Sequence, residues 1–384
     1  MSDRPYDLVL LGATGFTGSS TAAHLAGRTK GRPWAIAGRD AARLATIAEQ
    51  LAVYGDVPEV VVVDVTDELA LQALTSSTRV LATTVGPFAR LGMPVARACV
   101  ATGTDYADIT GEPAFVDQLL RDLDTPARAA GVRLVTCCGF DSVPHDLAVH
   151  HAVQVLPDDE PVVARGYVQV DAAFSGGTAA SALDAAVDLR RPDRPRRRVV
   201  GEGRRVRGMR PRVGRSDDPR GVALPMPTID PEVVLRSAAL LPSYGPDFRY
   251  AHHLVVAGPL QAAVLGGAAG LAAALSRLPG GRGALDRLVP ARGEGPAPGR
   301  RARSSFRTTV HARAAGGARA RAVVSGGDPG YDETARMLGE TALGLLDDEV
   351  GELTGVVTPA VALGDALRAR LVSQGQVHEV ELHR

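Results

Sequence analysis

Short apolar runs alternate with helical patterns along residues 1–140. The runs span residues 7–11, 33–37, 59–64, 79–85, 105–109 and 132–137. Between them, apolar residues recur three to four positions apart, which is the spacing of one helix face. This alternation predicts a doubly wound α/β fold, in which helices cover both faces of a parallel sheet. The run at 59–64 is Glu-Val-Val-Val-Val-Asp and is expected to be a buried strand.

The pattern changes near residue 140, and we expect three segments. Residues 1–140 are predicted to form a Rossmann-type nucleotide-binding domain. Residues 141–330 contain a longer strand and a later strand pair, and are predicted to form an inserted α/β (α+β) domain for substrate binding or dimerisation. Residues 331–384 carry helical patterns, and we expect these C-terminal helices to return to the first domain.

The first apolar run ends in the turn sequence Gly-Ala-Thr-Gly-Phe-Thr-Gly at residues 12–18. The first glycine permits a sharp turn after the strand, the second allows a diphosphate to approach the backbone, and the third allows the helix to pack closely. The helix that follows directs its N–H groups and its positive end at the phosphates. The predicted coenzyme contacts in this turn are Gly12, Thr14, Gly15, Phe16, Thr17 and Gly18.

The end of the second strand discriminates between the two nicotinamide coenzymes. An acidic side chain there binds the ribose 2′-hydroxyl of NAD, whereas an arginine pairs with the 2′-phosphate of NADP. The sequence has Arg39 followed by Asp40. We interpret Arg39 as the phosphate ligand and Asp40 as the cap of the next helix, which favours NADP. The alternative is that Asp40 binds the ribose and Arg39 stacks on the adenine.

Two later strand ends provide further cofactor candidates. Asp64 is expected either to accept a hydrogen bond from the adenine amine or to cap the helix that begins near Asp67. Gly86 and Pro87 follow the fourth strand, where ligands of open parallel sheets bind. They are expected to form a wall beside the nicotinamide ribose, the alternative being a simple strand-to-helix turn.

The composition excludes several classes of protein. The 384 residues include 43 basic and 43 acidic side chains, so no overall field attracts nucleic acid. Cys99, Cys137 and Cys138 cannot build a disulfide framework, which is typical of a reducing compartment. No basic, apolar leader precedes the first strand. We therefore expect a cytoplasmic protein that does not bind nucleic acid.

The scarcity of lysine excludes two mechanisms. Lys30 is the only lysine of the chain. A Tyr-x-x-x-Lys catalytic pair would need a tyrosine at position 26, where the chain has Ala26. A Schiff base is not expected either, because Lys30 lies in a polar turn rather than in an apolar pocket.

Metal binding is not predicted from the sequence. His150-His151 and His252-His253 are adjacent pairs, which cannot direct both rings at one ion from a regular helix, and no other cluster has the spacing of zinc ligands. The adjacent Cys137 and Cys138 are expected at a buried strand end rather than as a redox couple.

Two segments of the second domain have unusual compositions. Residues 190–215 hold twelve arginines and two acidic residues. This block is expected to be a mobile surface loop, or else a docking site for an anionic group such as an acyl-carrier domain or coenzyme A. Residues 254–278 carry no charge before Arg277. Burial is the favoured interpretation of that stretch, and the alternatives are peripheral contact with the inner face of the plasma membrane or a membrane span.

Several segments together resemble the saccharopine dehydrogenase-like oxidoreductases, and within them the trans-acting enoyl reductase branch. The matching segments are residues 12–18, 37–39, 85–88, 106–112, 137–144, 175–178 and 353–360. The resemblance implies a Rossmann domain, an inserted α/β domain and NADP-linked reduction. In this branch the substrate is the double bond of a polyketide-derived lipid chain, reduced for a synthase that lacks its own reductase domain. An acyl-carrier or polyketide synthase partner is therefore implied.

Reduction of an enoyl thioester requires donors for the thioester oxygen and a proton for the α-carbon. The loop after the strand at 132–137 supplies candidates at the expected sheet edge: Asp141 or His145 as proton donor and Ser142 as oxygen donor. The alternative is that Ser142 caps a helix and Asp141 holds the turn. Further candidates are Tyr106, Glu112, Ser175 and Thr178.

Two other functions are also compatible with the sequence. One is a dehydrogenase acting on an imine or amino-acid-type substrate, as the wider family name suggests. The other is a non-catalytic dinucleotide-binding sensor or assembly factor, which the absence of a Tyr/Lys pair supports. A homodimer is compatible with the sequence, which does not determine the oligomeric state.

Overall fold

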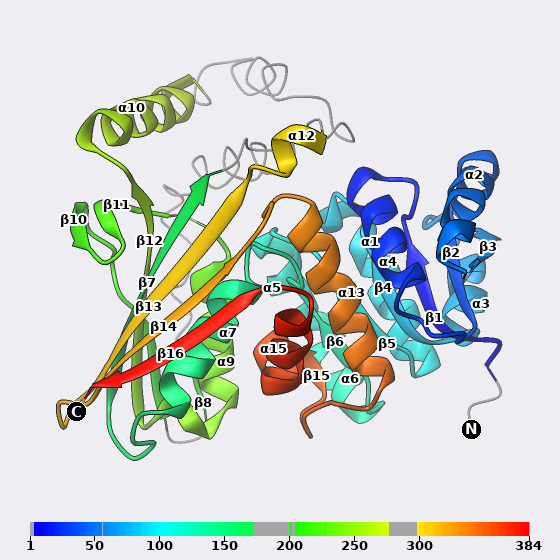
Figure 1. The fold of residues 1–384 in the computed structure, drawn as a ribbon. Coiled ribbons are helices and arrows are strands. Elements are labelled where there is room, and N and C mark those ends of the chain that lie inside the picture. Colours follow the sequence, from blue (N-terminus) through cyan, green and yellow to red (C-terminus); the bar gives the residue numbers. More distant parts are fainter. Residues whose placement is uncertain are drawn as a thin grey trace. The chain divides into compact units, whose positions relative to one another are not determined.

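The chain folds into two compact units in this computed structural model (Figure 1). The structure describes residues 4–55, 57–171, 200–201, 204–226, 228–275 and 298–383. Unit 1 comprises Met1–Val143 and Tyr331–Gln374, and unit 2 comprises Pro144–Gly330 and Gly375–Arg384. The sequence interpretation placed the whole of 331–384 with the first domain, but the last residues belong to unit 2.

Unit 1 is built on a seven-stranded, fully parallel sheet of order β15-β6-β5-β4-β1-β2-β3. Its strands are β1 (Tyr6–Leu11), β2 (Trp34–Gly38), β3 (Glu59–Val62), β4 (Thr78–Thr83), β5 (Asp105–Asp108), β6 (Arg133–Val135) and β15 (Gly355–Val357). The chain moves outward from β1 through β2 and β3, and then returns to β4 and moves outward on the other side. This order confirms the predicted doubly wound α/β fold, and it puts the topological switch point between β1 and β4.

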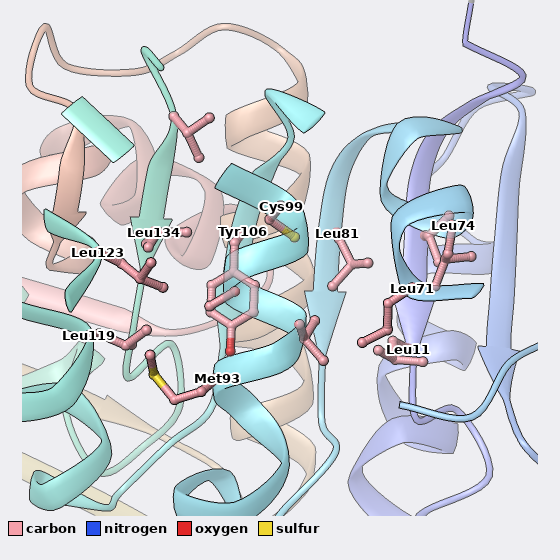
Figure 2. Packing of buried hydrophobic residues seen from close by; sticks show 14 of the residues in the cluster. Leu11, Leu71, Leu74, Leu81, Met93, Cys99, Tyr106, Leu119, Leu123 and Leu134 are labelled. Atoms are coloured by element: carbon pink, nitrogen blue, oxygen red, sulfur yellow. The ribbon is translucent and has the colours of Figure 1, made fainter. Parts of the chain in front are cut away.

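Helices connect the strands of unit 1. They are α1 (Phe16–Ala26), α2 (Ala41–Leu51), η1 (Ala52–Tyr54), α3 (Glu68–Ser76), α4 (Phe88–Thr102), α5 (Pro113–Asp122), α6 (Asp124–Ala129), α13 (Asp332–Leu346), α14 (Pro359–Ala362) and α15 (Gly364–Ser373). Apolar side chains from the sheet and from α3, α4 and α5 form one continuous core cluster (Figure 2). Tyr106 and Phe115 are fully buried in it, so Tyr106 is a core residue.

The expectation of a buried strand at residues 59–64 is wrong. β3 is the last strand of the sheet, and it leaves Val62 57% exposed and Val60 38% exposed. Only Val63, just beyond the strand, is fully packed. The β-branched run therefore reflects strand propensity at a sheet edge rather than burial on both faces.

Unit 2 contains a nine-stranded sheet with the main order β10-β11-β12-β7-β13-β14-β16, and β9 pairs with both β12 and β8. The strands are β7 (Val162–Asp171), β8 (Val200–Gly201), β9 (Arg204–Gly208), β10 (Gly214–Asp217), β11 (Arg220–Pro225), β12 (Asp247–Val256), β13 (Ser305–Ala314), β14 (Arg319–Gly326) and β16 (Val377–His383). The helices are α7 (Val143–Gln154), α9 (Asp230–Leu240), η2 (Pro242–Tyr244), α10 (Pro259–Leu275) and α12 (Pro298–Arg301). This mixed sheet agrees with the predicted second α+β domain. Residues 377–383 form the strand β16 rather than a helix, and they pair antiparallel with residues 319–325 of β14.

Part of the arginine-rich block is ordered as strands rather than as the expected mobile loop. β9 runs parallel to β12 and buries Val206, while Arg205 and Arg207 on either side of it are exposed. The side chains of β9 therefore alternate between a solvent-exposed and a buried face, as in an ordinary strand, and the high arginine content does not prevent this. Residues 190–199 and 202–203 of the block lie outside the described residues, as do Ser175 and Thr178.

The apolar stretch at 254–278 does not form one buried helix. Residues 254–256 complete β12, and α10 begins at Pro259. Leu260 is 79% exposed, and Val264 and Leu271 are each 62% exposed. The favoured interpretation of burial is therefore wrong for the described part of this helix, and residues 276–278 lie outside that part. Among the described residues, no helix is long and apolar enough to span a membrane.

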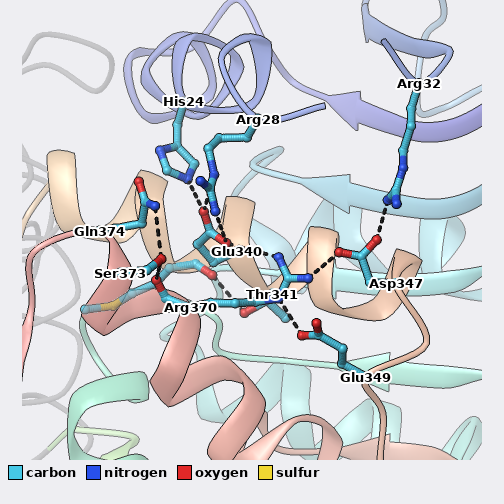
Figure 3. Close-up of polar contacts among 11 residues, drawn as sticks. His24, Arg28, Arg32, Glu340, Thr341, Asp347, Glu349, Arg370, Ser373 and Gln374 are labelled. Atoms are coloured by element: carbon cyan, nitrogen blue, oxygen red, sulfur yellow. Dashed lines mark hydrogen bonds and ion pairs between the residues drawn. The ribbon is translucent and has the colours of Figure 1, made fainter. Parts of the chain in front are cut away.

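A buried carboxylate ties the C-terminal helices of unit 1 to α1 (Figure 3). The Glu340 side chain on α13 is fully buried. It lies 2.9 Å from the His24 ring, 3.1 Å from the Arg28 guanidinium and 3.3 Å from the Arg370 guanidinium. Burial alone would raise the pKa of Glu340, but hydrogen bonds and the charges of His24 and Arg28 hold that pKa below its usual value. Glu340 is therefore an ionised side chain that connects α13 to α1 and α15 through ion pairs.

We expect Glu340→Ala to lower the free energy of unfolding of unit 1 by about 3–5 kcal/mol, because it leaves buried or half-buried cations without their partner. Glu349→Ala is the matched control, since Glu349 also pairs with Arg370 but is 41% exposed, and it should cost less than about 1 kcal/mol. Trp34, the only tryptophan, is buried in β2 and reports unfolding of unit 1 by fluorescence during a urea titration. Equal decreases in the free energy of unfolding for the two variants would contradict the stabilising role assigned to Glu340.

Candidate functional site

The turn between β1 and α1 is held open by contacts from two neighbouring strand ends. The Gly12 N–H donates to the Ala37 carbonyl at 2.8 Å, and the Thr84 hydroxyl donates to the Gly12 carbonyl at 3.1 Å. The Gly15 N–H closes the turn by donating to the Gly12 carbonyl. Thr84 was not identified from the sequence, because its role depends on β4 lying beside β1.

Backbone packing explains the glycines of this turn. Gly12 has φ +94°, a region that favours glycine, and a Cβ on Gly18 would lie only 2.1 Å from the Gly12 carbonyl oxygen. Gly15 differs, because its Cβ would meet only the Gly12 oxygen at an ordinary 3.5 Å. The space above Gly15 is therefore open. A diphosphate fits there, over the start of α1.

The N-terminus of α1 is suited to an anion. Its N-cap residue, Gly15, has no side chain that could cap the helix, and the first turn contains no acidic residue. The N-terminus of α4 is different, since the Glu112 carboxylate accepts hydrogen bonds from the Phe88 and Ala89 N–H groups at 2.9 and 2.8 Å. The positive end of the helix dipole at α1 thus faces no acidic residue of its own first turn, whereas at α4 it is already neutralised by Glu112. Glu112 is a helix-capping residue.

The remaining turn residues take different positions. The Thr14 carbonyl accepts a hydrogen bond from the Arg43 guanidinium at 3.1 Å. The Phe16 ring packs edge-on against the Tyr331 ring, with centroids 4.4 Å apart. The Thr17 carbonyl accepts from the Thr21 hydroxyl inside α1. Arg43 is therefore a second guanidinium at this turn, which the sequence did not single out.

At the end of β2 the two candidate ligands have separate roles. The Asp40 carboxylate accepts from the Arg43 N–H at 3.0 Å and so caps α2. Arg39 is exposed, and its charge acts on Asp64. Hydrogen bonds from the Thr66 N–H and hydroxyl lower the pKa of the exposed Asp64 carboxyl. Asp64 therefore does not cap α3, because Asp67 does.

Gly86 and Pro87 lie between β4 and α4, with Pro87 at the N-cap position of the helix. Gly86 is exposed and Pro87 is half-buried. Both follow the carboxyl end of a strand next to β1, on the side of the switch point where ligands bind in this type of sheet. The structure thus brings them to the same sheet edge as the glycine turn.

Asp108 is an additional buried carboxyl at this sheet edge. It accepts hydrogen bonds from the Tyr106 hydroxyl, the Thr110 N–H and the Cys137 N–H at 2.9, 2.9 and 3.0 Å. Burial raises its pKa to about 6, although these hydrogen bonds oppose the increase. Asp108 thereby joins the loops that follow β5 and β6. This role could not be predicted from the sequence, because it depends on two strands becoming neighbours in the sheet.

The three catalytic candidates divide between the units. In unit 1, Asp141 is half-buried, and one of its carboxylate oxygens lies 3.0 Å from the position of a Cβ on Gly111. Ser142 is only 1% exposed, and its side chain lies beside the Cys137 thiol. Burial raises the pKa of that thiol well above its usual value, and all three cysteines are free and buried.

His145 belongs to unit 2 and is fully buried. Its Nδ1 lies 3.1 Å from the Asp230 carboxylate, and its ring packs edge-on against that of His252. Burial and the nearby charge of His145 lower the pKa of His252 to about 3. His145 is therefore part of a buried polar cluster rather than a side chain open to solvent.

Comparison with known proteins places this architecture in a family. Residues 8–135 match the saccharopine dehydrogenase NADP binding domain. A Mycobacterium ulcerans (strain Agy99) protein named trans-acting enoyl reductase is 35% identical over 413 residues, covering 98% of each chain. A Mycobacterium tuberculosis (strain H37Rv) protein, whose name assigns it provisionally to the same activity, is 37% identical over 410 residues, covering 97% of this chain and 96% of its own. The chain belongs to the saccharopine dehydrogenase-like family, in its trans-acting enoyl reductase branch.

The fold of saccharopine dehydrogenase is shared as a whole. The apo saccharopine dehydrogenase (L-Glu forming) of Saccharomyces cerevisiae superposes with a TM-score of 0.59 at 13% identity, covering 99% of this chain and 100% of the yeast chain. The NADP-binding domain of the family coincides with unit 1. This saccharopine dehydrogenase-like protein is therefore an NADP-dependent oxidoreductase. The open space above Gly15, the absence of an acidic residue from the first turn of α1 and the exposed Arg39 fit that coenzyme.

We expect Gly15→Ala to fold normally but to weaken NADPH binding by tenfold or more, since the added methyl group occupies the space over the turn. Gly18→Ala should instead destabilise unit 1, because its Cβ collides with backbone. Calorimetric titration with NADPH and urea unfolding separate the two effects. Undiminished NADPH affinity in Gly15→Ala would place the diphosphate elsewhere.

Asp108 should make the stability of unit 1 depend on pH. A carboxyl with a raised pKa in the folded state contributes stability that is complete below its unfolded pKa of about 4 and is lost as the pH rises through about 6. The expected loss is about 3 kcal/mol. Asp108→Asn keeps the acceptor oxygen and should remove this slope, whereas Asp122→Asn, which changes an exposed acid on α5, should retain it. Urea unfolding at several pH values measures the slopes, and a slope unchanged in Asp108→Asn would refute the assignment.

Proposed function

We propose that this protein is an NADPH-dependent enoyl reductase whose substrate is an acyl thioester presented by a carrier or polyketide synthase partner. The observation that carries the proposal is the likeness over almost the full chain to proteins named trans-acting enoyl reductase. The word trans-acting in those names describes reductases that serve another protein. The coenzyme geometry of unit 1 is compatible with this role.

The coenzyme-binding residues follow from the geometry of the turn. Gly12, Gly15 and Gly18 allow a diphosphate to approach the start of α1, and Arg39 pairs with the 2′-phosphate. Arg43 supports the turn from α2 through the Thr14 carbonyl. When held there, NADPH would supply a hydride for the β-carbon of the enoyl group, and a proton donor of the protein would protonate the α-carbon to give the saturated thioester and NADP⁺.

Asp141 is the residue that we assign to proton delivery. It follows the carboxyl end of β6, at the sheet edge that also contains the glycine turn, and its side chain is only half-buried. Ser142 and His145 are buried and thus less accessible to a substrate. Ser142 is proposed to hold the loop through Cys137, so that the Asp141 carboxyl keeps its position.

The test is reduction of enoyl thioesters by the purified full-length chain. With NADPH we expect a saturated thioester, detected by mass spectrometry, together with loss of NADPH absorbance. Asp141→Asn should lower kcat by about 10²–10⁴-fold, the usual contribution of a general acid, while the Kd for NADPH stays within about twofold because Asp141 does not hold the coenzyme. Glu352→Gln, which alters an exposed acid of unit 1, is the control and should leave both values unchanged.

Other outcomes would replace the proposal. Reduction of imines but not of enoyl thioesters would favour an amino-acid-type dehydrogenase. NADPH binding without turnover of either substrate class would favour a sensor or an assembly factor. Full activity in Asp141→Asn would move proton delivery to another group or to water.

A further inference from the structure

A cluster of potential metal ligands lies inside unit 2. Its members are far apart in the sequence, so no motif spacing indicates it. It consists of His145 on α7, Asp230 at the start of α9 and His252 on β12. All three side chains are fully buried. One ligand atom from each lies within 4.8 Å of the others. We propose that these residues bind one divalent transition-metal ion, with zinc as the favoured ion.

The separations of the ligand atoms suit a single ion. His145 Nδ1 lies 3.1 Å from Asp230 Oδ1, and His252 Nε2 lies 3.9 Å from Asp230 Oδ2. Ligands at zinc bond lengths of roughly 2.0–2.1 Å in a tetrahedron are about 3.3 Å apart. A small movement of the His252 ring therefore completes the geometry. Two imidazoles and one carboxylate match the ligand chemistry of zinc, and a fourth position remains for water.

The nitrogen of His252 that faces the cluster is unsatisfied. Within the described part of the chain, His252 Nε2 has no hydrogen-bond partner, although the side chain is fully buried. Its distance of 3.9 Å from Asp230 is too long for a hydrogen bond. A buried polar atom without a partner lowers the stability of the folded state. A metal ion at this position would accept the lone pair of His252 Nε2, which otherwise has no bonding partner.

Neighbouring hydroxyl groups orient two of the ligands. The Tyr250 hydroxyl lies 2.9 Å from His252 Nδ1, and Tyr250 is itself fully buried. When Nδ1 donates its proton to this oxygen, the lone pair of the imidazole is at Nε2, on the side of the cluster. The Thr228 hydroxyl donates to Asp230 Oδ2 and so helps to fix the orientation of the carboxylate. Metal sites are typically supported by contacts of this kind.

The charge of the surroundings also favours a cation. Asp146, on the same helix as His145, is also fully buried. The Ser237 hydroxyl donates to Asp146 at 2.5 Å. Two buried carboxylates are costly unless positive charge compensates them. A divalent ion between the histidines supplies that charge, and the competing arrangement is a hydrogen-bonded network without a metal ion.

The test is metal content, measured by mass spectrometry on the full-length chain purified without a metal-affinity tag from zinc-supplemented medium. We expect about one zinc per chain in the wild type, and a loss of at least tenfold in His252→Ala and in Asp230→Asn. His311→Gln is the matched control. His311 lies 3.3 Å from the Asp218 carboxylate in the same unit but is 40% exposed and outside the cluster.

A second variant separates metal loss from unfolding. Tyr250→Phe keeps all three ligands and removes only the hydroxyl that orients His252. We expect it to retain the circular dichroism of the wild type and to bind Co²⁺ about 10–100-fold more weakly, as measured by the visible absorption of tetrahedral Co²⁺ after refolding. A wild type without metal, together with no saturable Co²⁺ absorption after refolding, would overturn the proposal and leave the metal-free network.

Discussion

The Gly12 carbonyl oxygen lies 2.1 Å from the place of a Cβ on Gly18, so the first turn and the first helix of unit 1 can approach each other only without a side chain. This contact sets the angle at which α1 leaves β1, and with it the direction of the helix N-terminus. Thr84 reinforces the arrangement from β4, on the other side of the switch point. Coenzyme recognition in the NADP-binding unit depends on that fixed geometry.

Features that depend on neighbouring residues in the sequence could be predicted. The glycine turn, the strand and helix alternation and the capping role of Asp40 each arise within a few residues, where backbone freedom and capping act locally. The prediction that Asp40 caps a helix is confirmed by its hydrogen bond to the Arg43 N–H. The parallel sheet followed from the same local periodicity.

Features that depend on distant partners could not be predicted. Glu112 caps α4 across 24 positions, and Asp108 reaches Cys137 across 29. Both contacts exist only after β4, β5 and β6 become neighbours in the sheet. The same limit applies to His252, which as one of an adjacent histidine pair suggested no metal site, although the fold places it beside His145 and Asp230. Residues 59–64 were misjudged because apolar composition does not distinguish a central strand from an edge strand.

The chain crosses between the two units three times, after Val143, after Gly330 and after Gln374. The last crossing supplies β16, which pairs with β14 along Ser325 to Arg319. No single proteolytic cut or stop codon can therefore release either unit as an intact fragment. Expressing the two units separately would require joining non-adjacent parts of the gene. An affinity tag fused to the carboxyl end would follow β16, which is an edge strand of the nine-stranded sheet.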